Sequence, residues 1–346
     1  MLIDRADLGE AKQMTVLVTG AAGFIGMHTV RALLDRGERV VGIDNMNAYY
    51  DPALKRARLQ ELEGRDGFVF ERIDFSDRDA MQAFDARHPE IDRIVHLGAQ
   101  AGVRYSIQQP FDYAQANLIG HLVMMEMARG RMEPTRARPG LKHFVYASSS
   151  SVYGANRDIP FSVDHRVDRP VSFYGATKKA NEVMTYSYAS LYGIPATGLR
   201  FFTVYGPWGR PDMSPWLFAE RILRGEPIQV FNHGQMRRDF TFIDDIVTGV
   251  LAALDHPPAA GADGVPNAVY NLGNNKPVAL LDYIRVIETA CGRKAVLDMK
   301  PMQPGDVLET FADIDASTRD LGYVPGTAIE DGIPVFIDWF RRYHGL

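Results

Sequence analysis

The chain has 346 residues, of which 46% are hydrophobic and 23% charged, a composition typical of a folded globular protein and not of a disordered one. A formal net charge of −5 gives no electrostatic reason to bind nucleic acid or an anionic membrane, so neither partner is expected. The single cysteine, Cys291, excludes an intrachain disulfide and a cysteine-built zinc site. Its neighbours predict that it is a buried helix residue.

The charged first 13 residues lack the apolar segment of an export signal, and no stretch approaches the roughly 20 apolar residues that span a membrane. We therefore expect a cytoplasmic protein. The nine histidines are scattered and form no metal-ligand motif, so no metal site is expected.

The first part of the chain alternates strand-like and helix-like segments. Short apolar, β-branched runs predict strands at 15–19, 39–43, 68–73, 93–97, 143–147 and 196–200. Apolar residues at helical spacing predict helices at 24–36, 52–63, 77–87, 110–128 and 172–192. Such alternation predicts an α/β fold of the Rossmann kind, with a doubly wound parallel sheet and helices on both faces.

The regular alternation of strands and helices ends at about residue 205, where one segment is rich in glycine and proline. Shorter helices are expected at 215–224, 243–254, 279–291 and 328–343. We predict an N-terminal extension (1–13), a sheet domain (14–205), and a smaller C-terminal α/β part (206–346) that binds substrate. The last two are expected to interleave after residue 205.

A glycine-rich turn joins the first strand to the first helix: Gly20-Ala21-Ala22-Gly23-Phe24-Ile25-Gly26. In a dinucleotide-binding turn, Gly20 permits the tight bend, Gly23 lets a pyrophosphate approach, and Gly26 lets the helix pack on the strand. The helix N-terminus then offers N–H groups to the phosphates. Three glycines are weak evidence alone, but here a strand precedes them and a helix follows.

Two carboxylates follow the next strands. Asp44 comes roughly 20 residues after the glycines, where a carboxylate binds the adenosine ribose and repels a 2′-phosphate. This favours NAD over NADP; the alternative is that Asp44 caps a loop. Asp74 ends the third strand and is expected either to hold the adenine amino group or to serve as a turn residue.

Tyr174 and Lys178 are four residues apart at the start of a predicted helix, so their side chains share one face. An ammonium close to a phenol lowers its pKa and makes it a usable acid and base. A run of four serines, 148–151, follows the predicted strand 143–147, at the sheet edge where open α/β folds bind ligands. The alternative for this run is a polar loop.

Together these residues resemble the extended short-chain dehydrogenase/reductase family, most closely its UDP-glucuronate 4-epimerases, from residue 15 to about 339. The strings that carry the resemblance are HLGAQAGVRYS (96–106), SSSSVYG (148–154), YGATKK (174–179), LRFFTVYGPWGRPDM (199–213), RRDFTFIDD (237–245) and MQPGD (302–306).

The resemblance implies a site for NAD and a UDP-sugar. The implied catalytic residues are Ser149, Tyr174 and Lys178. Besides the glycines, Asp44, Asp74, Tyr174 and Lys178, the implied cofactor-binding residues are Phe24, Ile25, Asn45, Phe75, Leu97, Ala99, Gln100 and Asn117. The implied substrate-binding residues are Ser149, Ser150, Ser151, Thr203, Arg210, Arg238 and Asp306. Neutral-hexose epimerases carry a second phosphate arginine where this chain has Gln303, and Arg104 is a candidate replacement or a surface residue.

The implied reaction is NAD-dependent 4-epimerisation of UDP-glucuronate to UDP-galacturonate through a transient 4-keto sugar. Ser150 and Ser151 stand where related dehydratases and decarboxylases carry acids, which favours epimerisation. The alternatives are a UDP-glucuronate decarboxylase, a UDP-hexose 4-epimerase, or a regulator that senses NAD without catalysis. Helices 110–128 and 172–192 resemble the family's dimer-forming pair, so a homodimer is expected.

Overall fold

The structure is a computed structural model that describes residues 14–136, 138–302 and 308–346. The predicted extension, Gln303 and Asp306 lie outside the described residues. Seven strands form one parallel sheet: β1 (Thr15–Thr19), β2 (Arg39–Asp44), β3 (Phe68–Arg72), β4 (Arg93–His96), β5 (His143–Ser149), β6 (Ala196–Phe201) and β10 (Asn267–Leu272). The predicted doubly wound α/β fold is confirmed.

The order of the sheet, β10-β6-β5-β4-β1-β2-β3, reverses direction beside β1. Thr19 of β1 pairs with Ile43 of β2 on one side and His96 of β4 on the other, and all three strands run parallel. Chains that leave the carboxyl ends of β1 and β4 therefore diverge, and the crevice between them is where open α/β sheets bind ligands.

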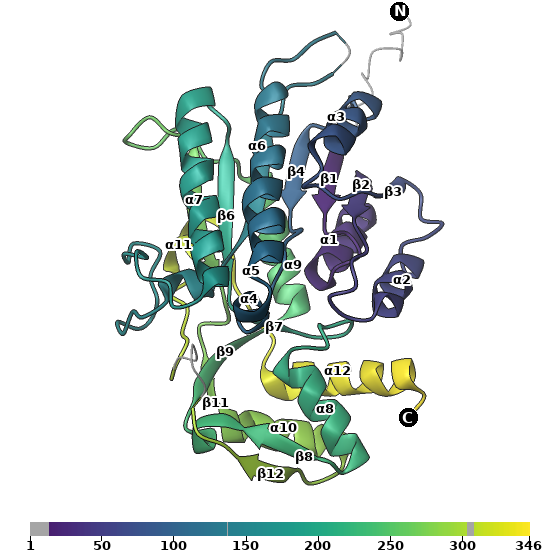
Figure 1. The fold of residues 1–346 in the computed structure, drawn as a ribbon, viewed down its shortest axis with the longest axis vertical. Coiled ribbons are helices and arrows are strands. Elements are labelled where there is room, and N and C mark those ends of the chain that lie inside the picture. The colour runs from purple at the N-terminus through teal and green to yellow at the C-terminus, as the bar shows by residue number, and fades with distance from the viewer. Residues whose placement is uncertain (1–13, 137, 303–307) are drawn as a thin grey trace, which may run out of the picture.

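Helices cover both faces of the sheet (Figure 1). They are α1 (Phe24–Asp35), α2 (Pro52–Gln60), α3 (Arg78–Arg87), α6 (Gly120–Gly130), α7 (Phe173–Tyr192) and α9 (Ile243–Asp255). Val16 and Val18 of β1 pack into the hydrophobic cluster that contains the α1 and α9 side chains. Leu17, between them, packs into the cluster formed with α3 and α6. Alternate residues of one strand thus bury against opposite layers, which explains why the strand is apolar throughout.

The predicted helix 110–128 is present but locally widened. It comprises α5 (Pro110–Tyr113), a π-helical segment η1 (Ala114–Ile119) and α6, and is preceded by the short α4 (Tyr105–Gln108). Such π-helical turns insert one residue into a helix and are frequent at functional sites. Here the widened turn carries the buried Asn117.

The C-terminal part builds two small sheets, which lie below the main sheet in Figure 1. One consists of β7 (Thr203–Tyr205), β9 (Arg237–Phe242) and β11 (Pro277–Ala279); the other pairs β8 (Pro227–Val230) with β12 (Val296–Met299). Besides α9, the helical segments of this part are α8 (Ser214–Arg224), η3 (Phe231–Gly234), α10 (Leu280–Cys291), α11 (Asp315–Leu321) and α12 (Ile329–His344), whereas η2 (Ser150–Tyr153) follows β5 directly. The four predicted C-terminal helices correspond to α8, α9, α10 and α12. Cys291 ends α10 and is buried, as predicted.

Candidate active site

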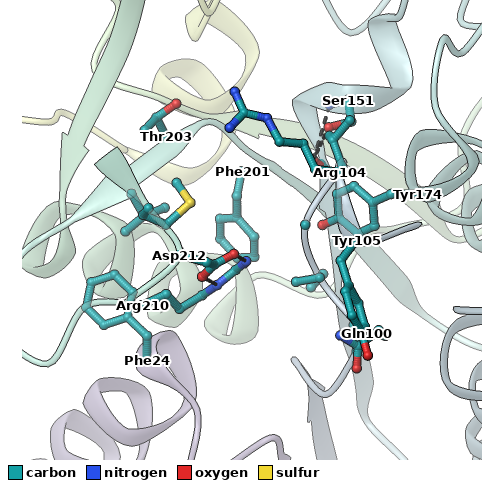
Figure 2. A pocket seen from close by; sticks show the side chains of 18 of the residues that line it. Phe24, Gln100, Arg104, Tyr105, Ser151, Tyr174, Phe201, Thr203, Arg210 and Asp212 are labelled. Carbon is teal, nitrogen blue, oxygen red and sulfur yellow. Dashed lines mark hydrogen bonds and ion pairs between the residues drawn. The ribbon is translucent and has the colours of Figure 1, made fainter. Parts of the chain in front are cut away.

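A cavity of about 840 Å³ lies at the carboxyl ends of β1, β4 and β5, and is closed from the other side by residues that follow β6. Its walls therefore come from both parts of the chain. Figure 2 shows Tyr174 and Ser151 on one side of this cavity and Arg210 with Asp212 on the other.

The glycine turn leaves no room for larger residues. Gly20 has φ +70°, and a Cβ on it would lie 2.9 Å from Gly98 Cα. A Cβ on Gly26 would lie 2.0 Å from the Gly20 carbonyl oxygen. Helix α1 begins directly after Gly23 with no capping side chain and no acidic residue in its first turn. Its N-terminal N–H groups therefore face the cavity without a carboxylate beside them. This arrangement suits the pyrophosphate of a dinucleotide.

The carboxylate of Asp44 is buried at the end of β2 and lines the cavity. Its Oδ1 accepts hydrogen bonds from Met46 N at 2.8 Å and from Lys55 Nζ at 3.2 Å. Asp74 does not line the cavity. Its carboxylate accepts hydrogen bonds from Asn45 Nδ2 at 3.0 Å and from the N–H and hydroxyl of Ser76. Of the two roles expected for Asp74, these contacts are those of a turn residue.

Most of the other predicted cofactor residues line the cavity as well: Phe24, Ile25, Asn45, Phe75, Leu97, Ala99 and Gln100. Asn117 is the exception, because its amide is buried behind the wall. It accepts from Gln100 N at 2.8 Å and donates to Gln100 O and to Thr177 Oγ1, each at 3.0 Å. Asn117 thus fixes the strand-to-helix loop to α7 and does not reach the cavity itself.

Tyr174, Lys178 and Ser149 are brought together by α7 and β5. The Ser172 hydroxyl caps α7 by accepting from Gly175 N at 3.0 Å, so Tyr174 sits in the first turn above the cavity. Lys178, one turn later, is buried and donates to Ala147 O at 2.8 Å. Ser149 ends β5, its hydroxyl donates to Ser151 Oγ at 3.2 Å, and its side chain is close enough to Tyr174 to lower the pKa of the phenol.

The electrostatics of Tyr174 differ from the expectation. Burial raises the pKa of its phenol above the ordinary value of 10, and the charges and hydrogen bonds that oppose this rise come from Arg210 and Ser149. Lys178, predicted to lower that pKa, bonds Ala147 instead, and burial lowers its own pKa to about 7. An uncompensated ammonium is costly to bury, which explains the direction of that shift.

The predicted substrate residues Ser149, Ser150, Ser151, Thr203, Arg210 and Arg238 all line the cavity. The guanidinium of Arg104 also lies there, 5.0 Å from the centre of the Phe231 ring. This cation–π contact joins the loop after β4 to the C-terminal part.

Arg210, which the resemblance implies to bind substrate, lines the cavity but also has an internal partner. Its Nε lies 3.0 Å and its Nη2 2.5 Å from the two carboxylate oxygens of Asp212. The Tyr49 hydroxyl donates to the same carboxylate at 2.9 Å. A ligand carboxylate must therefore share Arg210 with Asp212. The string GRPDM contains both residues, but nothing in their spacing indicates a bidentate pair.

A buried ion pair lies directly behind the serine run. Arg200 of β6 donates to both carboxylate oxygens of Glu182 at 2.8 and 2.9 Å, and the Ser148 hydroxyl donates to the same group at 2.7 Å. Arg200 also donates to the Tyr153 hydroxyl at 3.0 Å. The pair holds β5, β6 and α7 in register behind Ser149. Sequence reasoning missed it because the partners come from three separate elements.

No helix within residues 14–136, 138–302 and 308–346 is long and apolar enough to cross a membrane. Within the same ranges, no three or more His, Cys, Asp or Glu side chains gather in a way that could hold a metal ion.

Comparison with known proteins agrees with this geometry. Residues 16–273 match the NAD dependent epimerase/dehydratase family. The chain is 49% identical to an uncharacterized 37.6 kDa protein of Escherichia coli O111:H-, an alignment that covers 96% of this chain and 99% of that protein. It is 43% identical to a probable UDP-glucuronate 4-epimerase of Rhizobium meliloti, over 96% of this chain and 99% of the relative.

Among solved structures, the UDP-glucuronic acid 4-epimerase of Bacillus cereus, in complex with UDP-glucuronic acid and NAD, superposes with a TM-score of 0.85. It is 33% identical and covers 95% of this chain and 100% of its own. The resemblance inferred from the sequence motifs is thereby confirmed. The chain belongs to the NAD dependent epimerase/dehydratase family.

Proposed function

We propose that this protein interconverts UDP-glucuronate and UDP-galacturonate by NAD-dependent epimerisation at C4 of the sugar. The observation that carries the proposal is the serine run: Ser149, Ser150 and Ser151 line the cavity beside Tyr174, and none of them is a carboxylic acid. The named relatives from Rhizobium meliloti and Bacillus cereus support the same substrate class.

Tyr174 is the group that moves the proton. Its phenolate, which Arg210 and Ser149 favour against the effect of burial, removes the proton from the sugar 4-hydroxyl, and the Ser149 hydroxyl shares the hydrogen bond. NAD, held by the glycine turn and Asp44, would supply reversible hydride acceptance at C4, and turning of the planar 4-keto sugar in the site would let the hydride return to its opposite face. Lys178 holds α7 against β5 through Ala147 O and orients the nicotinamide ribose.

Arg210 and the serine hydroxyls recognise the C6 carboxylate of the sugar. A planar guanidinium suits a carboxylate because it presents several N–H donors in one plane, and Asp212 engages only Nε and Nη2. Arg210→Ala should therefore weaken binding of UDP-glucuronate far more than binding of UDP-glucose. Equal losses for the two ligands in a titration would assign Arg210 to the nucleotide or to the fold.

The diphosphate and uridine bind in the C-terminal part. Arg238 and Thr203 line that end of the cavity, and Arg104 is placed beside Phe231 to supply a further positive charge. Asp306, which the resemblance implies to hold the uridine ribose, lies outside the described residues.

The 4-keto form of glucuronate is a β-keto acid and loses carbon dioxide readily. Since this loss needs no enzymic base, protection comes from geometry: hydrogen bonds to the carboxylate hold the C5–C6 bond out of alignment with the carbonyl π system. Removing two donors, with Ser150→Ala and Arg210→Ala together, should raise the share of pentose product while total turnover falls. Losing about 1.4 kcal/mol of discrimination would change the product ratio tenfold.

The protein forms a homodimer through α6 and α7, which lie side by side in Figure 1. Large apolar side chains stand exposed on these helices and on the segment before them: Ile107, Phe111, Ile119, Leu122, Val183 and Leu191. Phe111 is 86% exposed, so a monomer would leave this large apolar side chain in water, whereas a second copy of the chain would cover it. Light scattering on the purified protein measures the mass directly.

The experiment that tests the proposed reaction is incubation of the purified protein with UDP-glucuronate, followed by NMR of the product sugar. UDP-galacturonate with little UDP-pentose supports it. Mainly UDP-pentose would identify a decarboxylase, turnover of UDP-glucose alone would identify a neutral-hexose epimerase, and binding without turnover would identify a regulator.

A further inference from the structure

A buried lysine stands at the adenosine end of the cofactor site. Lys55 lies in the first turn of α2, and its ammonium is 3.2 Å from Asp44 Oδ1 and 3.1 Å from Asn47 Oδ1. The Lys55 side chain is 8% exposed and that of Asp44 is 7% exposed. All three residues line the cavity, so this buried ion pair borders the space that a dinucleotide would occupy.

The two charges act on a nucleotide in opposite ways. A carboxylate at the end of β2 accepts from ribose hydroxyls and repels a 2′-phosphate. A lysine ammonium is a compact positive charge that binds phosphate. Asp44 Oδ1 already accepts from Met46 N and Lys55, and among the described residues no donor is placed on Oδ2. That oxygen is therefore the one that remains for a ribose hydroxyl.

We infer that the pair of Asp44 and Lys55 sets the choice between NAD and NADP, with Lys55 a latent 2′-phosphate-binding residue that Asp44 keeps neutralised. If the charge of Asp44 is removed, the ammonium is left buried with only the neutral Asn47 oxygen as partner. An uncompensated buried cation favours an anionic partner, and the 2′-phosphate of NADP supplies one at this position.

Other charged groups lie near this subsite. Arg72, exposed at the end of β3, donates to Asn45 O at 3.3 Å, and the buried Arg58 of α2 donates to the Tyr50 hydroxyl at 2.5 Å and to Ala22 O at 3.2 Å. The Asp74 carboxylate is engaged by Asn45 and Ser76. Arg72 therefore provides a matched control, since it is a cation of the same loop region that is not paired with Asp44.

The test compares Asp44→Asn, Asp44→Asn/Lys55→Gln, Asp44→Asn/Arg72→Gln and the unmodified protein. Asparagine keeps an acceptor for Met46 N while it removes the charge. Each protein is purified with the nucleotide it acquires in cells, denatured, and its NAD and NADP are quantified by mass spectrometry. Thermal unfolding with added NADP gives a second readout that needs no turnover.

The unmodified protein should release NAD. Asp44→Asn should raise the ratio of bound NADP to NAD at least about tenfold, which corresponds to about 1.4 kcal/mol. Adding Lys55→Gln should abolish most of that gain, and adding Arg72→Gln should leave it. Asp44→Ser tests the same point if the asparagine variant does not purify.

Either of two results would overturn the inference: no gain of NADP in the Asp44 variants, or a gain that persists without Lys55. The inference depends on the dinucleotide alone, so it stands or fails separately from the sugar substrate proposed above.

Discussion

The substitution Gly26→Ala tests whether the glycine turn binds the cofactor, because the structure gives the distance from an added Cβ to the neighbouring backbone. The new Cβ would lie 2.0 Å from Gly20 O and 2.8 Å from Gly20 C, so it would have to move by about 1 Å merely to reach the 3.0 Å below which Cβ atoms are essentially never found. Both neighbours are backbone atoms, so α1 must shift away from β1. A misplacement of about 1 Å can cost about 10²-fold in the rate of a positioned reaction, so a displaced N-terminus of α1 should also hold the pyrophosphate poorly.

We expect the Gly26→Ala protein to purify with less than a tenth of the NAD of the unmodified protein, measured after denaturation. NAD at about 100 times its dissociation constant should stabilise the unmodified protein by about 2.7 kcal/mol, and most of this gain should vanish in the variant. Gly326→Ala is the matched control, because a Cβ there meets no atom within 4 Å and the backbone has no positive φ. Full NAD occupancy in the Gly26→Ala protein would refute the assignment of the glycine turn as the pyrophosphate-binding site.

Three further substitutions probe the catalytic wall. Tyr174→Phe should lower turnover about 10²–10⁴-fold while NAD and the UDP-sugar still bind, and a variant that keeps half the rate would end the assignment of Tyr174 as the proton-transfer group. Glu182→Gln should lower the free energy of unfolding by about 3–5 kcal/mol, because it leaves the buried Arg200 without its counter-charge; urea unfolding measures this, and a loss below 1 kcal/mol would contradict it. Lys178→Met should stabilise the ligand-free protein most at or below pH 7. The folded-state pKa of Lys178, about 7, lies below its ordinary 10.5, so the unfolded chain binds more protons between these values, and the cost of burying Lys178 falls as pH rises through this window. A stability difference that stays constant from pH 6 to 10 would exclude that shift.

Local patterns in the sequence were sufficient to predict six of the seven strands of the main sheet and the glycine turn. The strand from Thr15 to Thr19 and the helix beginning at Phe24 are each specified by residues close together in the chain. The place of β10 was not predictable in this way, since its edge position beside β6 depends on a chain that returns from the C-terminal part.

Charge pairing within the site could not be predicted either. Asp212 holds Arg210, and Lys55 holds Asp44, through folds of the backbone that sequence spacing does not encode. Likewise Asn117 was expected at the cofactor, but the widened turn η1 places it behind Gln100. In each case the residue type was conspicuous, but the pairing depends on how the backbone turns: Arg210 and Asp212 are only two residues apart, whereas Lys55 and Asp44 come from two successive elements.

The most direct test of the central claim follows a deuterium atom. UDP-glucuronate labelled with deuterium at C4 is incubated with the purified protein in ordinary water, and the label in UDP-galacturonate is measured by NMR and mass spectrometry. Transient oxidation at C4 with return of the same hydride predicts that the product keeps deuterium at C4. Loss of the label to solvent would mean that the inversion proceeds by proton exchange, and would contradict the mechanism assigned to Tyr174 and NAD.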